Sequence, residues 1–153
     1  MTRGSIPNWR ATLARWLRES SADTRDPGGP EARVYEVPFA EVWDEVVGEV
    51  ERRPRWTLSH RDEELGLISV TCRSPVPRLI DDLTVWISLD EDGLTRVELL
   101  SKSRNGRGDF GVNRRRIEGL LRHLDHAVGS DHRVLRRGRP PSGSAPGVDR
   151  GIG

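Results

Sequence analysis

Apolar residues recur at helical spacing in two segments of the chain. The first follows Pro38 and stops before Pro54, and a proline is tolerated in the first turn of a helix but not in its interior. Its apolar positions are Phe39, Val42, Trp43, Val46 and Val50. The second segment begins near Asp109 and stops at Gly129, with apolar positions Ile117, Leu120, Leu121, Leu124 and Val128. The spacing i, i+3, i+4, i+7 and i+11 predicts two helices that each bury one face.

Five other segments alternate between apolar and polar residues, as expected for strands with one buried face. They are residues 33–37, 56–61, 67–72, 83–89 and 95–103. Residues 62–66 and 90–93 separate consecutive strands and end in glycine, so they predict two hairpin turns. Between the hairpins, Pro75 and Pro77 favour an extended connection over residues 73–82. The apolar side chains of this connection are candidates for a lip over a pocket.

The elements follow the order strand, helix, four strands in two hairpins, and helix. We therefore predict an α+β domain over residues 33–128, with an antiparallel sheet of about five strands and both helices packed on one face. The other face of the sheet is predicted to carry Thr84, Trp86, Ser88, Glu98 and Leu100.

The two ends of the chain differ from this domain. Residues 1–19 predict a basic amphipathic helix, with Trp9, Leu13, Trp16 and Leu17 at helical spacing and arginines elsewhere on its surface. Residues 20–32 contain the run PGGP and predict a linker. Residues 129–153 are rich in Arg, Gly, Pro and Ser, and predict a disordered basic tail.

The amphipathic helix at residues 1–19 has three alternative roles. It covers the open face of the sheet, which is the interpretation we favour, it docks on a partner, or it lies on an anionic membrane surface through its tryptophans and arginines.

Composition narrows the classes of function. Of 153 residues, 34% are apolar and 32% charged, which fits one soluble domain. No apolar run approaches the ~20 residues of a membrane-spanning helix, and arginines interrupt the N-terminal apolar stretch, so no signal peptide is expected. We expect a cytoplasmic protein, with peripheral attachment to a membrane surface left open through residues 1–19.

Net charge and cysteine content exclude further kinds of partner and site. A net charge of +1 provides little overall attraction to nucleic acid, so nucleic acid is not an expected partner. Cys72 is the single cysteine, which excludes an internal disulfide and a cysteine-based zinc site. His123 and His126 lie three residues apart on the last predicted helix, where exposed helix polarity explains them better than a metal site. We expect neither a cofactor nor a metal.

The segment with the most distinctive chemistry is residues 101–117, SKSRNGRGDFGVNRRRI. It joins the last strand to the last helix, and three glycines within six residues permit a tight turn. Asp109 is predicted to cap the helix with its side-chain oxygen. Asn113 precedes Ile117 by four positions, so its amide is predicted to lie on the buried side of the helix, where it needs hydrogen-bond partners.

The pattern S-x-S-R-x-G-x-x-D-x-G-x-N-x-x-R-I in this segment resembles the signature of the domain-of-unknown-function family 1499. The resemblance extends less sharply from about Tyr35 to Val128, and it implies no reaction because the family has no established activity. The marked positions are Asp82, Ser103, Arg104, Gly106, Asp109, Gly111, Asn113, Arg116 and Ile117. The chain departs from the family at residues 6–8, which lack the cysteine of the Cys-Pro-x-x-Pro-Asn-like segment that many relatives carry.

We predict a binding surface built from the joint at residues 101–113 and the connection at residues 73–82. The candidate binding residues are Asp82, Ser103, Arg104, Gly106, Arg107, Asp109, Asn113 and Arg116. A glycine-rich turn at a helix N-terminus flanked by arginines suits an anion. The same residues also suit a purely structural joint, in which the arginines pair with Asp81 and Asp82.

The leading hypothesis for function is a non-catalytic domain that binds a small anionic ligand or a protein partner. The alternatives are a hydrolase-like enzyme that uses Asp82, Asp109 and Arg104, and a peripheral membrane protein attached through residues 1–19.

Overall fold

The computed structural model describes residues 21–25, 29–75, 79–104, 111–129 and 133–134. The helices are α2 (Phe39–Arg52) and α3 (Val112–Ala127). The strands are β1 (Ser21–Asp23), β2 (Arg33–Tyr35), β3 (Trp56–Asp62), β4 (Leu67–Arg73), β5 (Ile80–Leu89), β6 (Thr95–Ser103) and β7 (Arg133–Val134). The strand order is β3-β4-β5-β6-β2-β7, with β1 also pairing with β6, and each pair is antiparallel. The predicted α+β class and antiparallel sheet are confirmed.

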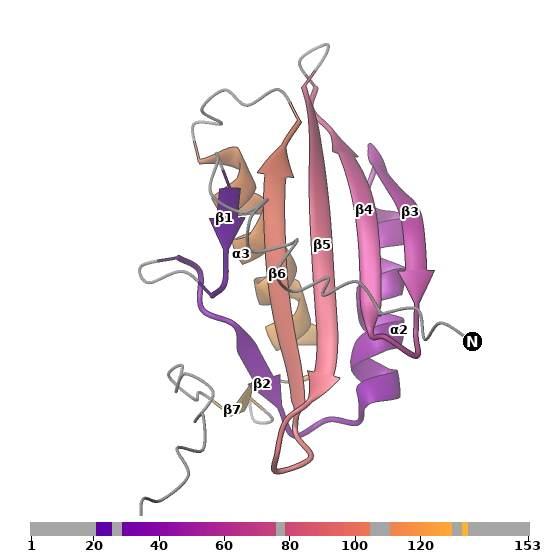
Figure 1. The fold of residues 1–153 in the computed structure, drawn as a ribbon, viewed down its shortest axis with the longest axis vertical. Helices are drawn as coiled ribbons and strands as arrows, with labels where there is room; N and C mark the ends of the chain where they lie inside the picture. The colour runs from indigo at the N-terminus through magenta and orange to yellow at the C-terminus, as the bar shows by residue number, and fades with distance from the viewer. Residues whose placement is uncertain (1–20, 26–28, 76–78, 105–110, 130–132, 135–153) are drawn as a thin grey trace, which may run out of the picture.

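Both helices lie behind the sheet in Figure 1, so they cover one of its two faces. The apolar stripe of α2 is buried as predicted, with Val42, Val46 and Val50 inaccessible to solvent. The stripe of α3 is buried in the same way at Ile117, Leu120, Leu121 and Leu124. These side chains pack on the inward residues of β4, β5 and β6. Each buried aliphatic side chain of this size stabilises the fold by about 1.5–3 kcal/mol.

Polar contacts fix the last turns of α3 to the edge of the sheet. The Tyr35 hydroxyl donates to Asp125 Oδ1 at 2.8 Å, and Arg33 Nε lies 3.2 Å from both oxygens of the same carboxylate. Tyr35 is fully buried, so its hydroxyl needs this acceptor. The residue after the helix, Val128, packs against the core, and Gly129 follows with φ +81°, which confirms the predicted end of the helix.

The start of α3 differs from the prediction. The helix begins at Val112, and its N-cap position is held by Gly111 with φ +78°. A glycine has no side chain to act as a cap, whereas its positive φ is a conformation that glycine adopts without strain. Asp109, the predicted cap, lies outside the described residues.

The second hairpin begins earlier than its alternation indicated. β5 starts at Ile80, and the Ser74 amide donates to the Leu79 carbonyl at 3.0 Å. The connection between the hairpins is therefore shorter than the predicted segment 73–82, and Asp81 and Asp82 belong to the strand. Leu79 is 45% exposed, while the central residues 76–78 of the predicted lip lie outside the described residues.

The predicted count of about five strands is too low. β1 lies within residues 20–32, which were predicted as a linker, and β7 lies within residues 129–153, which were predicted as a tail. Strands of three and two residues are too short to show an alternating pattern, and their pairing with β6 and β2 forms only in the folded chain. The predicted amphipathic helix at residues 1–19 lies outside the described residues.

The face of the sheet opposite the helices carries the side chains predicted for it. Ser88 is exposed, Thr84, Trp86 and Glu98 are partly exposed, and Leu100 is 6% exposed. Figure 1 shows no helix of the described residues on this face. None of the helices in the described part of the chain has the length and apolar content to cross a membrane.

The turn between β3 and β4 provides a test of the fold. Gly66 has φ +64°, and a Cβ there would lie 1.9 Å from the Ile87 carbonyl oxygen, while the Gly66 carbonyl accepts from the Ile87 amide. We predict that Gly66→Ala lowers the free energy of unfolding by more than 2 kcal/mol, about the upper limit for a left-handed backbone alone, because the β4–β5 ladder must also shift.

The matched control is Gly93→Ala. Gly93 has φ +75° with nothing within 4 Å of its added Cβ, so only the backbone cost of about 1–2 kcal/mol is expected. Urea unfolding of both variants measures the difference, and equal losses would contradict the proposed steric conflict at Gly66.

Candidate functional site

A buried ion pair joins α3 to the start of β5. Arg116 Nη2 lies 2.6 Å from Asp81 Oδ2, and the two side chains are 8% and 7% exposed. The other Asp81 oxygen, Oδ1, accepts from the Ser103 hydroxyl at 2.7 Å. Both carboxylate oxygens of Asp81 are therefore occupied, which offsets part of the cost of removing the charge from water.

Asn113 extends this ion pair into a network. Its Oδ1 accepts from Ser101 Oγ at 2.5 Å and from Arg116 Nη1 at 2.7 Å, while its Nδ2 donates to Ser103 Oγ at 3.1 Å. Arg116 Nη1 also donates to Ser101 Oγ at 2.9 Å. Asn113 is fully buried, so the predicted inward position is confirmed, and the bonds of its side chain to β6 run to two serine hydroxyls.

The sequence positions these five side chains through two periodicities. Asn113 and Arg116 are three residues apart on α3 and therefore share one side of the helix. Ser101 and Ser103 are two residues apart on β6 and share the face covered by the helices. Asp81 pairs in register with Ser103, which brings its carboxylate to the same face. The five side chains Asp81, Ser101, Ser103, Asn113 and Arg116 are called the buried network below.

A second ion pair lies beside the buried network on the opposite face of the sheet. Arg104 Nε and Nη2 lie 2.9 and 2.8 Å from the two oxygens of Asp82, and Nη2 also donates to Thr71 Oγ1 at 3.3 Å. The Arg104 and Asp82 side chains are 49% and 38% exposed. Hydrogen bonding to Asp82 raises the pKa of Arg104 further above its ordinary value. We call Thr71, Asp82 and Arg104 the exposed triad.

The two groups lie within a segment of the sequence that matches a known protein family. The family model "Protein of unknown function (DUF1499)" matches residues 19–124. The chain belongs to this family. The match includes the exposed triad and all five residues of the buried network, and it confirms the family inferred from the sequence. A search of curated proteins found no match to the chain.

The predicted binding residues of this DUF1499 chain are divided by the sheet. Ser103, Asn113 and Arg116 meet in the buried network, whereas Asp82 and Arg104 meet in the exposed triad. Alternation along β5 and β6 causes the division, because neighbouring residues of a strand point to opposite faces. Gly106, Arg107 and Asp109 lie outside the described residues.

Asp81 and Ser101 were not among the predicted binding residues, although both are central to the buried network. Asp81 falls within residues 73–82, which were predicted as the connection before a strand. A signal for its inward position exists, because Asp81 continues the two-residue period of the buried Leu83, Val85 and Ile87. A buried position was not predicted for Asp81 because a carboxylate is rarely buried unless it has a partner.

Cys72 lies beside the buried network, where burial disfavours ionisation of its thiol. It pairs in register with Asp81 across β4 and β5 and is fully buried. Burial raises the pKa of its thiol to about 12, and the nearby Asp81 carboxylate acts in the same direction, against the lowering effect of Arg116. The thiolate is the nucleophilic form of cysteine, so a nucleophilic role for Cys72 near neutral pH is disfavoured.

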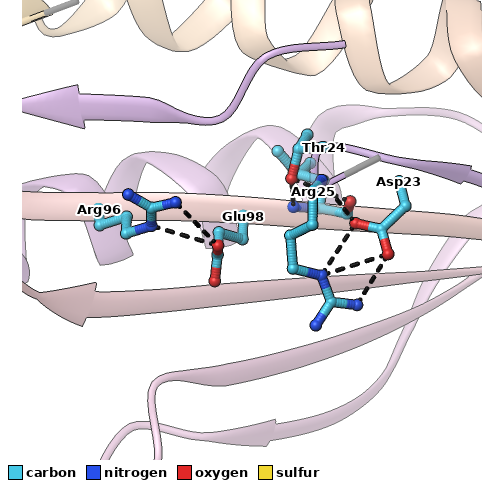
Figure 2. A network of polar contacts seen from close by, with 6 residues as sticks. Asp23, Thr24, Arg25, Arg96 and Glu98 are labelled. Atoms are coloured by element: carbon cyan, nitrogen blue, oxygen red, sulfur yellow. Dashed lines mark hydrogen bonds and ion pairs between the residues drawn. The ribbon is translucent and has the colours of Figure 1, made fainter. Parts of the chain in front are cut away.

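Further ion pairs lie on the face opposite the helices, as Figure 2 shows. Arg25 binds both oxygens of Asp23, with Nη2 at 2.8 Å from Oδ2, and Arg96 Nη2 lies 3.1 Å from Glu98 Oε1. The Arg25 guanidinium also lies 5.1 Å from the ring centroid of Trp86. With Asp82 of the exposed triad included, three carboxylates on this face are paired with arginines.

The outer side of the helices carries a separate charged cluster. His123 Nε2 of α3 lies 2.7 Å from Glu45 Oε1 and 3.4 Å from Glu49 Oε2 of α2, and Arg52 also contacts Glu45 at 2.9 Å. The hydrogen bond to His123 lowers the pKa of Glu45 below its ordinary value of 4.5, against the opposing effect of burial. This cluster connects the two helices. No group of three or more metal-ligating side chains occurs in the described parts of the chain.

A shallow groove lies at the end of the sheet opposite the buried network. It has a volume of about 610 Å³ and is lined by Glu36, Val37, Pro38, Glu41, Asp44, Glu45, Ala127 and Val128. None of the predicted binding residues lines this groove.

The buried network gives a prediction for stability. Arg116→Met removes the partner of a buried carboxylate, and we expect the free energy of unfolding to fall by about 3–5 kcal/mol. Adding Asp81→Asn to the Arg116→Met chain removes the carboxylate charge that has lost its partner. This double variant is expected to recover part of the lost stability. Urea unfolding of the two variants provides the measurement.

Arg104→Ala is the control for this experiment, because it breaks an exposed ion pair on the other face and should leave stability almost unchanged. A large loss in Arg104→Ala, or no recovery in the Arg116→Met/Asp81→Asn chain, would contradict the role assigned to the buried network.

The charged cluster between the helices gives a prediction for pH dependence. The pKa of Glu45 is lower in the folded chain than its ordinary value of 4.5, so its contribution to stability is complete above that pH and is lost as the pH falls through the folded pKa. The difference in unfolding free energy between the wild type and Glu45→Gln should therefore shrink as the pH falls below 4.5. A difference that does not change across this pH range would contradict the role assigned to the contact between His123 and Glu45.

Proposed function

We propose that this member of the DUF1499 family is a non-catalytic binding domain. In this proposal the buried network is a structural clamp, and the exposed triad contacts the ligand. The observation that carries the proposal is the division of the predicted residues between a closed interior group and an exposed pair of charges.

The closed state of the buried network supports its role as a clamp. Each of its polar side chains bonds to other members of the group, and both Asp81 oxygens have donors. Networks satisfied in this way rigidify a joint and specify one arrangement of the elements that they connect. General acid or base chemistry needs a titratable group within reach of the substrate, and the burial of Asp81 disfavours such a role.

The orientation of Arg104 supports a small anion as the ligand. Two of its nitrogens are held by Asp82 and Thr71, while Nη1 has no partner among the described residues. A guanidinium held in this way loses less freedom when it binds a carboxylate or phosphate. Lys102 pairs in register with Asp82 and adds a second positive charge on this face.

The hydrolase-like alternative is less well supported. It requires Asp82 to act as a free base or nucleophile, together with Asp109 and Arg104. Both Asp82 oxygens accept hydrogen bonds from Arg104, so the carboxylate is already engaged in an ion pair.

Titration with inorganic phosphate, followed by the amide signals of the isotopically labelled full chain at low salt, tests the proposal. We expect shifts centred on residues 80–82 and 102–104. Arg104→Ala should abolish the response. Asp82→Asn removes a negative charge beside the site and keeps an oxygen that can accept from Arg104. The affinity should therefore increase several-fold, because two unit charges about 4 Å apart interact by about 1 kcal/mol in water.

Arg52→Ala is the matched control, since Arg52 is also an exposed arginine in an ion pair but lies on α2. It should leave the phosphate response unchanged. A response that survives Arg104→Ala, or one that Asp82→Asn weakens, would contradict an anion site at the exposed triad.

A further inference from the structure

We propose that residues 8–19 form a helix that packs across the face of the sheet opposite α2 and α3, over Leu67, Trp86 and Leu100. The occupant of this face is then a segment of the same chain. This inference goes beyond the proposed ligand site and does not depend on it, because it concerns the centre of the face, and the exposed triad lies nearer one end.

Apolar side chains lie at the centre of this face, and two of them are partly exposed to water. Leu67 and Trp86 are paired neighbours on β4 and β5, and Leu100 is the partner of Thr84, two residues before Trp86. Leu67 and Trp86 remain partly exposed. Arg25 covers part of the indole of Trp86 from the side of β1. An aromatic ring of this size gains stability from further cover.

β1 tethers the N-terminal segment at this face. Ser21 pairs in register with Lys102, and Asp23 pairs with Leu100, so the chain that precedes Ser21 starts within the sheet. Contact between residues 8–19 and the sheet is therefore intramolecular, and a short tether gives such a contact a high effective concentration. A partner in solution lacks this advantage.

The length of the segment fits the width of the face. Twelve residues of α-helix, 8–19, are about 18 Å long. The distance from β3 to β6 spans three strand spacings, or about 14 Å. One helix of this length therefore reaches across all four long strands.

The chemistry of the segment matches an apolar contact. In a helix, Trp9, Leu13, Trp16 and Leu17 share one side, and Arg10, Arg15 and Arg18 lie on the other sides. The carboxylates of Asp23, Asp82 and Glu98 on the face already have arginine partners. The arginines of the segment are then left facing water, and salt should affect the contact little.

A nitroxide label at Ala11→Cys in the full-length chain tests this arrangement. Ala11 falls on the polar side of the proposed helix, so the label does not block the contact. Cys72 is buried with a pKa of about 12 and stays unlabelled. We expect the amide signals of Ser69, Thr84 and Trp86 to lose most of their intensity, and this loss to persist at about 0.5 M salt, where charges are strongly screened.

Two variants separate apolar docking from proximity to the tether. Trp9→Ser with Trp16→Ser should restore the signals of β4 and β5, whereas Arg10→Ser with Arg18→Ser should leave them weakened. Signal loss confined to β1 and the adjoining end of β6 would overturn the inference.

Sedimentation of the full-length chain with vesicles of phosphatidylcholine and phosphatidylglycerol tests the alternative, in which residues 8–19 bind a membrane surface. Salt-sensitive sedimentation combined with full signals on β4 and β5 would assign residues 8–19 to a membrane surface instead. The phosphate titration of the exposed triad reports on a different contact, so either proposal can fail while the other holds.

Discussion

The arrangement of α3 on the sheet depends on the ion pair between Asp81 and Arg116. This pair replaces apolar packing at one end of the core, and removing two charges from water costs free energy that a hydrophobic pair would not. Hydrogen bonds from Ser103 to Asp81 and from Arg116 to Asn113 and Ser101 offset that cost. These bonds form in only one register of helix on sheet, so the pair contributes specificity to the fold, and the apolar core contributes most of its stability.

Polar contacts hold α3 at three levels along its length. The buried network fixes its first turns to β5 and β6, His123 joins its third turn to Glu45 of α2, and Asp125 binds Tyr35 and Arg33 of β2 near its end. Burial of the apolar stripe between these points is non-directional, so it constrains a small slide or rotation of the helix less than hydrogen bonds do. The three polar levels remove that freedom.

Alternation along the end of β6 links this scaffold to the outer surface. Ser101 and Ser103 point toward α3, and Lys102 and Arg104 point to the opposite face, so one short segment contributes to both faces of the sheet. The inward side chains satisfy one another, while Arg104 is oriented by Asp82 and remains exposed. Neighbouring residues of β5 and β6 therefore contribute to the buried network on one face and to the exposed triad on the other.

The sequence by itself determined the local elements and the family. Helical spacing located α2 and most of α3, two-residue alternation located β3, β4 and β6, and the spacing of Asn113 from Ile117 placed its amide inside. The tertiary structure decided what the sequence pattern could not. Asp81 is buried because Arg116 lies opposite it, 35 residues away, and β1 and β7 exist only because β6 and β2 offer edges to pair with. The predicted site divided into two because pairing register sets the face on which each side chain lies, and register is a property of strands brought together by folding.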